Sequence, residues 1–228
     1  VSALTYANRM NLFVKSIFVT SITTVFYPLI SKMATQADKT KFKKTIVKSV
    51  TGVNLLIVPI SIGTVFFSVP IINLVFGRGA FDNQAITMTA GSLFFYGLGM
   101  IGFAQREILS RVFYSLQDTR TPTINATIGV GVNIIFNIVL SKYMGIYGLA
   151  FATSISATIT MILLMINLKK KIGGFDFTDI IMTFMKILLS SLIMGGIAKI
   201  SFNYLIDSLS QNISLLIAIC IGAVSYFM

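Results

Sequence analysis

Long apolar stretches separated by short polar connections dominate the hydrophobicity pattern of this sequence. A helix that crosses a lipid bilayer needs about 20 consecutive, mainly apolar residues. Seven stretches approach or exceed that length, so the pattern predicts an all-α, polytopic transmembrane helix bundle. The predicted spans are approximately 3–31, 45–69, 85–116, 121–141, 146–168, 179–204 and 213–228, the last one cut short.

The polar connections between these spans differ in charge in a regular way. Those at 32–44, 111–120 and 169–176 each carry two or more lysines or arginines, whereas the intervening connections carry one or none. Cytoplasmic loops of membrane proteins are enriched in Lys and Arg. The alternation therefore predicts that the three basic connections are cytoplasmic and that the first span runs from outside to inside.

The organisation of the chain follows from one of these connections. Segment 169–178, which combines a lysine run with two glycines, is predicted to be a cytoplasmic linker. It would divide a transmembrane bundle of five helices over 1–168 from two additional C-terminal helices over 179–228. The sequence does not begin with Met and ends within an apolar run, and we interpret it as part of a longer polytopic protein.

Composition supports a membrane protein and excludes several kinds of chemistry. The chain is 55% hydrophobic and 11% charged, whereas a typical soluble domain is about 25% charged. It has no His and a single cysteine, Cys220, which excludes disulfides, Cys-rich metal sites and Ser-His or Cys-His catalysis. No enzyme is expected. The net charge of +11 is explained by the basic connections, and no nucleic-acid partner is expected.

The first span contains cations in an otherwise apolar segment, with Asn8, Arg9, Asn11 and Lys15 close together. A charge inside a span costs at least about 2.5–3.5 kcal/mol unless it faces protein or water. Snorkelling to the membrane surface could explain Arg9, but it explains the deeper Lys15 less well. Because Asn8, Asn11 and Lys15 share a helical stripe, we expect all four residues to bind substrate in a water-filled cavity. Arg9 would hold an anionic phosphate through two parallel hydrogen bonds.

A second polar group lies in the fourth and fifth predicted spans. Asn133 and Asn137 are four residues apart and share a face, and Thr153 lies in the next span. Amides and hydroxyls between membrane helices usually form packing hydrogen bonds, which is the simpler interpretation. The alternative is that the oxygens of Asn133, Asn137 and Thr153 coordinate a monovalent cation such as Na⁺ for coupling. No other cofactor is expected.

The remaining charged motifs are interpreted as structural. Glu107 and Arg111 are four residues apart and are expected to pair near the cytoplasmic end of the third span. Asp118 is expected to cap the helix that follows. "FGRGAFDNQ", which contains Arg78, is expected to form a turn at the outer surface of the membrane.

Four segments together resemble the MurJ (MviN) lipid II flippase family, within the MOP superfamily that also contains the MATE exporters. They are "SALTYANRMNLF", "FGRGAFD", "RVFYSLQDTRTP" and "GLAFATSISA", in the family's order and at its separations. The resemblance runs from Val1 to about Lys171. It implies a MATE-like fold of fourteen spanning helices: two lobes of six around a central cavity, and two more that form a lipid groove. This chain would supply helices eight to fourteen.

The resemblance also implies a function. Such a protein moves lipid II, the undecaprenyl-pyrophosphate-linked peptidoglycan precursor, from the inner to the outer leaflet of the bacterial cytoplasmic membrane by alternating access. Its partners would be lipid II, membrane lipids and the N-terminal lobe of the same polypeptide. Arg9 matches a cavity arginine of the family. Lys15, where the family often has a small residue, and Glu107, where many members have a basic one, depart from its pattern.

Three alternatives remain open at this point. One is a flippase for another undecaprenyl-linked oligosaccharide, such as an O-antigen or capsule unit. The second is a MATE-type multidrug exporter, which should show acidic cavity residues for cationic drugs, and the spans offer almost none. The third is a membrane scaffold that transports nothing, which would have no need of Arg9 or Lys15 inside a span.

Overall fold

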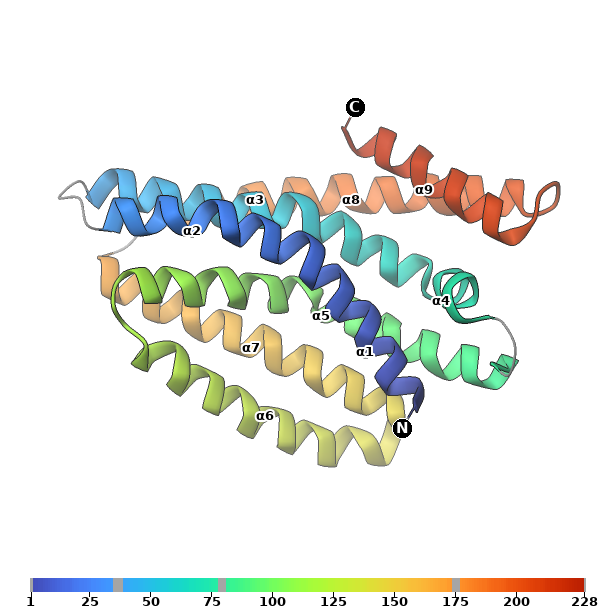
Figure 1. Cartoon of the computed structure of the whole chain (residues 1–228), viewed down its shortest axis with the longest axis horizontal. Coiled ribbons are helices and arrows are strands. Elements are labelled where there is room, and N and C mark those ends of the chain that lie inside the picture. The colour runs from blue at the N-terminus through green and yellow to red at the C-terminus, as the bar shows by residue number, and fades with distance from the viewer. Residues whose placement is uncertain (1, 35–38, 78–80, 174–176, 228) are drawn as a thin grey trace.

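The computed structural model describes residues 2–34, 39–77, 81–173 and 177–227, and within these ranges it is helical with no β-strand (Figure 1). The expected all-α bundle is therefore confirmed. The elements are α1 Ser2–Val14, η1 Lys15–Val19, α2 Thr20–Ala34, α3 Lys39–Phe66, α4 Ser68–Phe76, α5 Asn83–Ser115, α6 Arg120–Met144, α7 Ile146–Ile172, α8 Phe177–Leu205 and α9 Gln211–Phe227.

Six helical segments in the described ranges are long and apolar enough to cross a membrane, and they coincide with the first six predicted spans. The first of them is continuous from Ser2 to Ala34, because α1, the π-helical turn η1 and α2 follow one another without a break. The seventh predicted span corresponds to α9. With 17 residues, α9 is shorter than the roughly 20 that cross a bilayer.

The largest extensions of helices beyond the predicted spans are in the basic segments. α3 begins at Lys39 and not at 45, and α7 continues to Ile172 and not to 168. Lysine is a good helix former, and lysines in the last turn are also favoured by the helix dipole, so the basic segments continue the helices beyond the apolar core. Gly173, with φ +74°, ends α7 in the left-handed conformation that favours glycine. The lysine run assigned to the linker therefore lies in the last turn of α7.

Helix α5 occupies the centre of the bundle (Figure 1), where it packs against α1, α3 and α7, while α6 packs on α7. In the C-terminal half of α5, Ile108, Leu109 and Phe113 are fully buried. They pack in one cluster with Ile46 of α3 and Leu164 of α7. α8 lies along α3, and α9 packs on α8. The division of the chain at the linker stays a prediction.

Glycines bring α5 and α7 into close contact. A Cβ atom added at Gly99 would lie 2.7 Å from Cα of Ser154, and one added at Gly102 would lie 2.9 Å from the backbone nitrogen of Thr158. Ser154 Oγ donates to the carbonyl of Phe95 at 2.7 Å, so a hydrogen bond reinforces the contact. Ser156 similarly joins α7 to α6. Hydrogen bonds from these two serines thus link α7 to both α5 and α6, and α7 packs closely against each of them.

Candidate functional site

Arg9 lies on an exposed part of α1, next to the equally exposed Asn8. Its guanidinium carbon is 5.8 Å from the centroid of the Tyr6 ring, within the range of a cation–π contact. No ion pair joins Arg9 to an acidic residue in the part of the chain that the structure describes. Arg9 therefore presents its charge at the surface of this half of the protein, inside a membrane-spanning segment.

Asn11 does not share that open face. α1 packs against α5, and Ala7 and Asn11 are its two buried residues, with Asn11 only 7% exposed. Two positions four residues apart lie on one side of a helix, which explains why they are buried together. The structure thus places Asn11 between helices, whereas Asn8 and Arg9 remain accessible.

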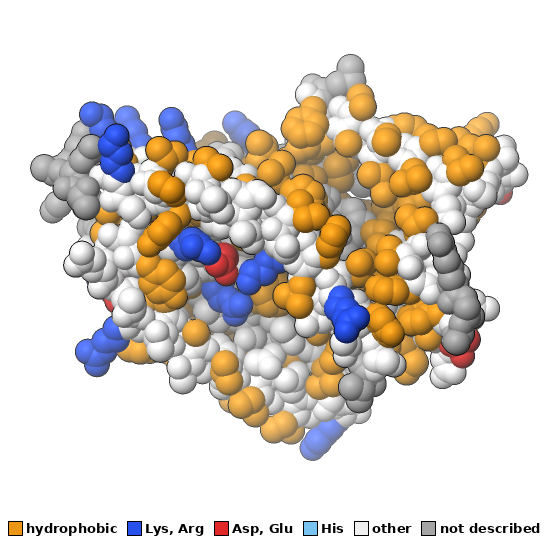
Figure 2. Space-filling view, viewed as in Figure 1, with side chains coloured by type: hydrophobic (Ala, Val, Ile, Leu, Met, Phe, Trp, Pro, Cys, Tyr) orange, Lys and Arg blue, Asp and Glu red, His pale blue; other side chains and the backbone are white. Residues whose placement is uncertain are grey.

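Lys15, at the start of η1, lies deeper and is paired. Its Nζ atom is 3.3 Å from Oε2 of Glu107 on α5, and Oε1 of Glu107 accepts a hydrogen bond from Nη2 of Arg111, also at 3.3 Å. The expected pairing of Glu107 with Arg111 is confirmed. Figure 2 shows cations gathered around an acidic group on the face that the first span crosses. The two departures from the family pattern, Lys15 and Glu107, therefore contact each other.

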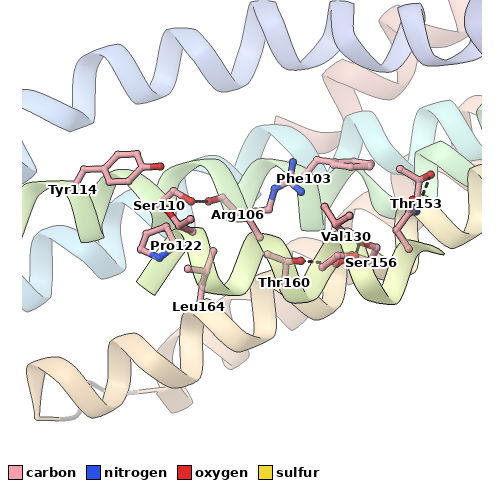
Figure 3. Close-up of a pocket in the computed structure, with 14 residues that line it drawn as sticks. Phe103, Arg106, Ser110, Tyr114, Pro122, Val130, Thr153, Ser156, Thr160 and Leu164 are labelled. Atoms are coloured by element: carbon pink, nitrogen blue, oxygen red, sulfur yellow. Dashed lines mark hydrogen bonds between the residues drawn. The ribbon is translucent and has the colours of Figure 1, made fainter. Parts of the chain in front are cut away.

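Arg106 is a candidate functional residue that the sequence analysis did not single out. It lines a cavity of about 560 Å³ between α5, α6 and α7, together with Tyr114, Thr123 and Thr160 (Figure 3). Its guanidinium carbon is 5.7 Å from the centroid of the Phe103 ring. The signal that could have identified it is an arginine well inside an apolar helix of 33 residues.

Asn133, Asn137 and Thr153 are brought together as predicted. Asn137 Nδ2 donates to Asn133 Oδ1 at 3.0 Å, and Asn133 Nδ2 donates to Thr153 Oγ1 at 3.3 Å. Thr153 Oγ1 in turn donates to the carbonyl of Leu149 at 2.8 Å. Oδ1 of Asn137 is buried and has no hydrogen-bond partner among the described residues. The chain of bonds fits the packing interpretation, and the buried oxygen fits a cation ligand.

At the predicted cytoplasmic end, Asp118 holds the connection between α5 and α6. Its Oδ1 accepts from the backbone nitrogen of Thr121 at 2.9 Å, which confirms the expected cap, and its Oδ2 pairs with Nζ of Lys171 on α7. The hydrogen bond from Lys171, followed by that from the Thr121 backbone, lowers the pKa of Asp118 to about 2. The carboxylate therefore stays charged at neutral pH.

Arg78 of the predicted outer turn lies outside the described residues.

Comparisons with known proteins agree with this structure. The family model described as "Lipid II flippase MurJ" matches residues 1–220. A "Lipid II flippase MurJ" of Thermosipho africanus is 31% identical over 98% of this chain and 43% of its own length. A "Probable lipid II flippase MurJ" of Vibrio cholerae is 32% identical over 72% of this chain and 31% of its own length.

A solved structure gives the same result in three dimensions. "Lipid II flippase MurJ, inward closed conformation" superposes with a TM-score of 0.84 at 31% identity, covering all of this chain and 45% of that one. The chain thus spans less than half the length of these relatives. With six long apolar helices in its described ranges it is a multi-pass membrane protein, and it belongs to the MurJ family of lipid II flippases.

Proposed function

We propose that the full-length protein containing this chain is a lipid II flippase of the bacterial cytoplasmic membrane. It would move the lipid-linked precursor from the inner to the outer leaflet by alternating access, with this chain as the C-terminal half. The observation that carries the proposal is Arg9, an exposed arginine inside a membrane-spanning helix with no acidic partner among the described residues.

The chemistry of Arg9 suits a pyrophosphate. An unpaired charge in a span is costly unless it faces water or a ligand, so its exposed face is expected to border the central cavity, which the N-terminal lobe would complete. The guanidinium group is always charged and offers several donors in a planar fork. That fork can hold two phosphate oxygens at once, which a single lysine ammonium cannot match in geometry.

The distribution of acidic residues favours an anionic substrate over a cationic drug. Among the described residues, Glu107 is the only acidic side chain that lies more than one turn inside a spanning helix. Its two oxygens are already occupied by Lys15 and Arg111. A multidrug exporter for cations would need a free carboxylate here, so this half of the cavity supports the flippase and not the exporter.

The group of Asn133, Asn137 and Thr153 supports two roles. Their hydrogen bonds to one another support packing between α6 and α7. The buried Oδ1 of Asn137, which lacks a partner among the described residues, supports a coupling cation such as Na⁺. If such an ion binds, Asn133 Oδ1, Asn137 Oδ1 and Thr153 Oγ1 would be its ligands from this chain, and the ion would stabilise the protein.

The experiment that tests the flippase proposal compares Arg9→Ala and Arg9→Lys in the full-length protein. Translocation of lipid II into proteoliposomes and rescue of a strain depleted of its own flippase are the two assays. We expect Arg9→Ala to insert normally, because removing a charge from a span favours insertion, and to lose translocation. Arg9→Lys keeps the positive charge but lacks the planar guanidinium group. It should retain partial translocation if the charge contributes more to substrate binding than the paired hydrogen bonds do.

The matched control is Lys142→Ala, which removes an exposed cation from the last turn of α6. It should translocate as the wild type does. Full rescue by Arg9→Ala at a normal protein level would contradict the substrate role and would leave snorkelling as the explanation of Arg9.

A further inference from the structure

The ion cluster between η1 and α5 has an unusual composition, with two cations sharing one carboxylate. Each oxygen of Glu107 takes one partner: Oε2 lies 3.3 Å from Lys15, and Oε1 lies 3.3 Å from Arg111. The Arg111 guanidinium also lies 5.5 Å from the centroid of the Tyr27 ring on α2. The cluster therefore joins the first span to α5 at two places.

Glu107, which joins the two cations of this cluster, lies well inside a membrane-spanning helix and not at its end. Glu107 precedes the last residue of α5 by eight positions, which corresponds to about 12 Å along a helix. Its side chain is 31% exposed, and those of Lys15 and Arg111 are 33% and 35% exposed. The three groups are therefore accessible from an open face while lying inside spanning segments, where a charge needs a partner or water.

The cations on this face differ in whether they have an acidic partner. Lys15 and Arg111 are held in ion pairs, whereas Arg9 and Arg106 have no acidic partner among the described residues. An anion that approaches Lys15 must displace a carboxylate, but one that approaches Arg9 meets a free guanidinium.

We propose that Glu107 is a positioning residue that removes Lys15 from the anion-binding set, so that the pyrophosphate of the substrate binds at Arg9 and not at Lys15. This inference rests on the proposed flippase function. It replaces the expectation that Lys15 binds substrate directly. In this arrangement Lys15 neutralises Glu107, whose carboxylate would otherwise repel a phosphate group that passes along the same face.

The test compares Lys15→Met, Glu107→Gln and the double variant in the full-length protein, measuring initial translocation rate against the mole fraction of lipid II. Lys15→Met leaves the carboxylate with one cation, so KM should rise on the order of tenfold through repulsion of the phosphate. Glu107→Gln frees both Lys15 and Arg111 from their ion pairs, so KM should fall and slower release should lower kcat.

The double variant is the decisive measurement. Because it removes both charges of the pair, its KM should return to within about twofold of the wild-type value, an interaction between neighbouring sites that independent effects would not produce. If Lys15 binds the substrate itself, the double variant will be as impaired as Lys15→Met, and the inference is overturned.

Two controls keep the result interpretable. If Lys15→Met does not insert, Glu107→Gln and the double variant carry the test alone. Arg111 is freed in both, so the KM of the double variant should exceed that of Glu107→Gln, and equal KM values contradict the inference. Lys142→Met, on the exposed end of α6, should leave both kinetic constants unchanged. Failure of the wild type to translocate lipid II would refute the proposed function and the inference with it, whereas a working wild type with an unrescued double variant refutes the inference alone.

Discussion

The contact between α5 and α7 gives a prediction whose size can be derived from the structure. Gly99→Ala would place a new Cβ atom 2.4 Å from Ser154 Oγ, 2.5 Å from its Cβ and 2.7 Å from its Cα. Real Cβ atoms essentially never approach other heavy atoms within 3.0 Å. Because one of these neighbours is a backbone atom, rotation of the serine side chain cannot relieve the overlap, and the two helices must separate.

Two terms then contribute to the loss of stability. Forcing an extra carbon into a packed interface typically costs about 1–3 kcal/mol. Separation also weakens the hydrogen bond from Ser154 to the carbonyl of Phe95, and such bonds between membrane helices contribute about 0.6 kcal/mol on average. Alanine offsets part of this, because it is a better helix former than glycine by about 1 kcal/mol. The net destabilisation should be about 1–2 kcal/mol.

The assay is the thermal midpoint of the purified full-length protein in detergent, with Gly131→Ala as the matched control. Gly131 lies in α6, and a Cβ atom added there meets nothing within 4 Å, so only the gain in helix propensity remains. Gly99→Ala should lower the midpoint, and Gly131→Ala should leave it unchanged or raise it slightly. Equal midpoints for the two variants would refute the conclusion that α5 and α7 are closely packed at this glycine.

Two further predictions concern the coupling ion and the topology. Asn137→Leu should abolish stabilisation of the full-length protein by Na⁺ while leaving the effect of K⁺ unchanged; if no ion stabilises the wild type, the group serves packing only. Cysteines placed at Lys41 and Asn83, both exposed, should react with a membrane-impermeant reagent from opposite sides of the membrane, and labelling from one side would contradict the alternation of basic connections.

The spanning helices were predictable because their length and hydrophobicity are set by the bilayer, but the face that each helix buries was not. The helical stripe placed Asn8, Asn11 and Lys15 together, whereas the structure exposes Asn8 and buries Asn11 against α5. In a soluble protein the apolar side of a helix marks the buried face. In a membrane, lipid is as apolar as leucine, so hydrophobicity does not distinguish lipid from a neighbouring helix.

Contacts between residues far apart in the chain could not be predicted from the sequence either. The pairing of Glu107 with Arg111 followed from their spacing on one helix, but the pairing of Lys15 with Glu107 depends on how the first span crosses α5. The π-helical turn that begins at Lys15 has the same origin, since nothing in "KSIFV" specifies a wider turn. The arginine at the "YANR" motif was identified because its cost in a span does not depend on tertiary structure.

The two kinds of contact made by α5 differ in a way that bears on the proposed alternating access. The backbones of α5 and α7 lie very close together at Gly99 and Gly102. Any shift of one helix against the other there would create steric overlap or a void. Towards the first span, part of its contact is an ion pair at 3.3 Å between side chains about one-third exposed, which can open and be rehydrated at a lower cost. The π-helical turn at the base of Lys15, a geometry often found at functional sites, lies on the same side. A transport cycle that moves this half of the protein would therefore shift the first span, which carries Arg9, against a fixed unit of α5 and α7.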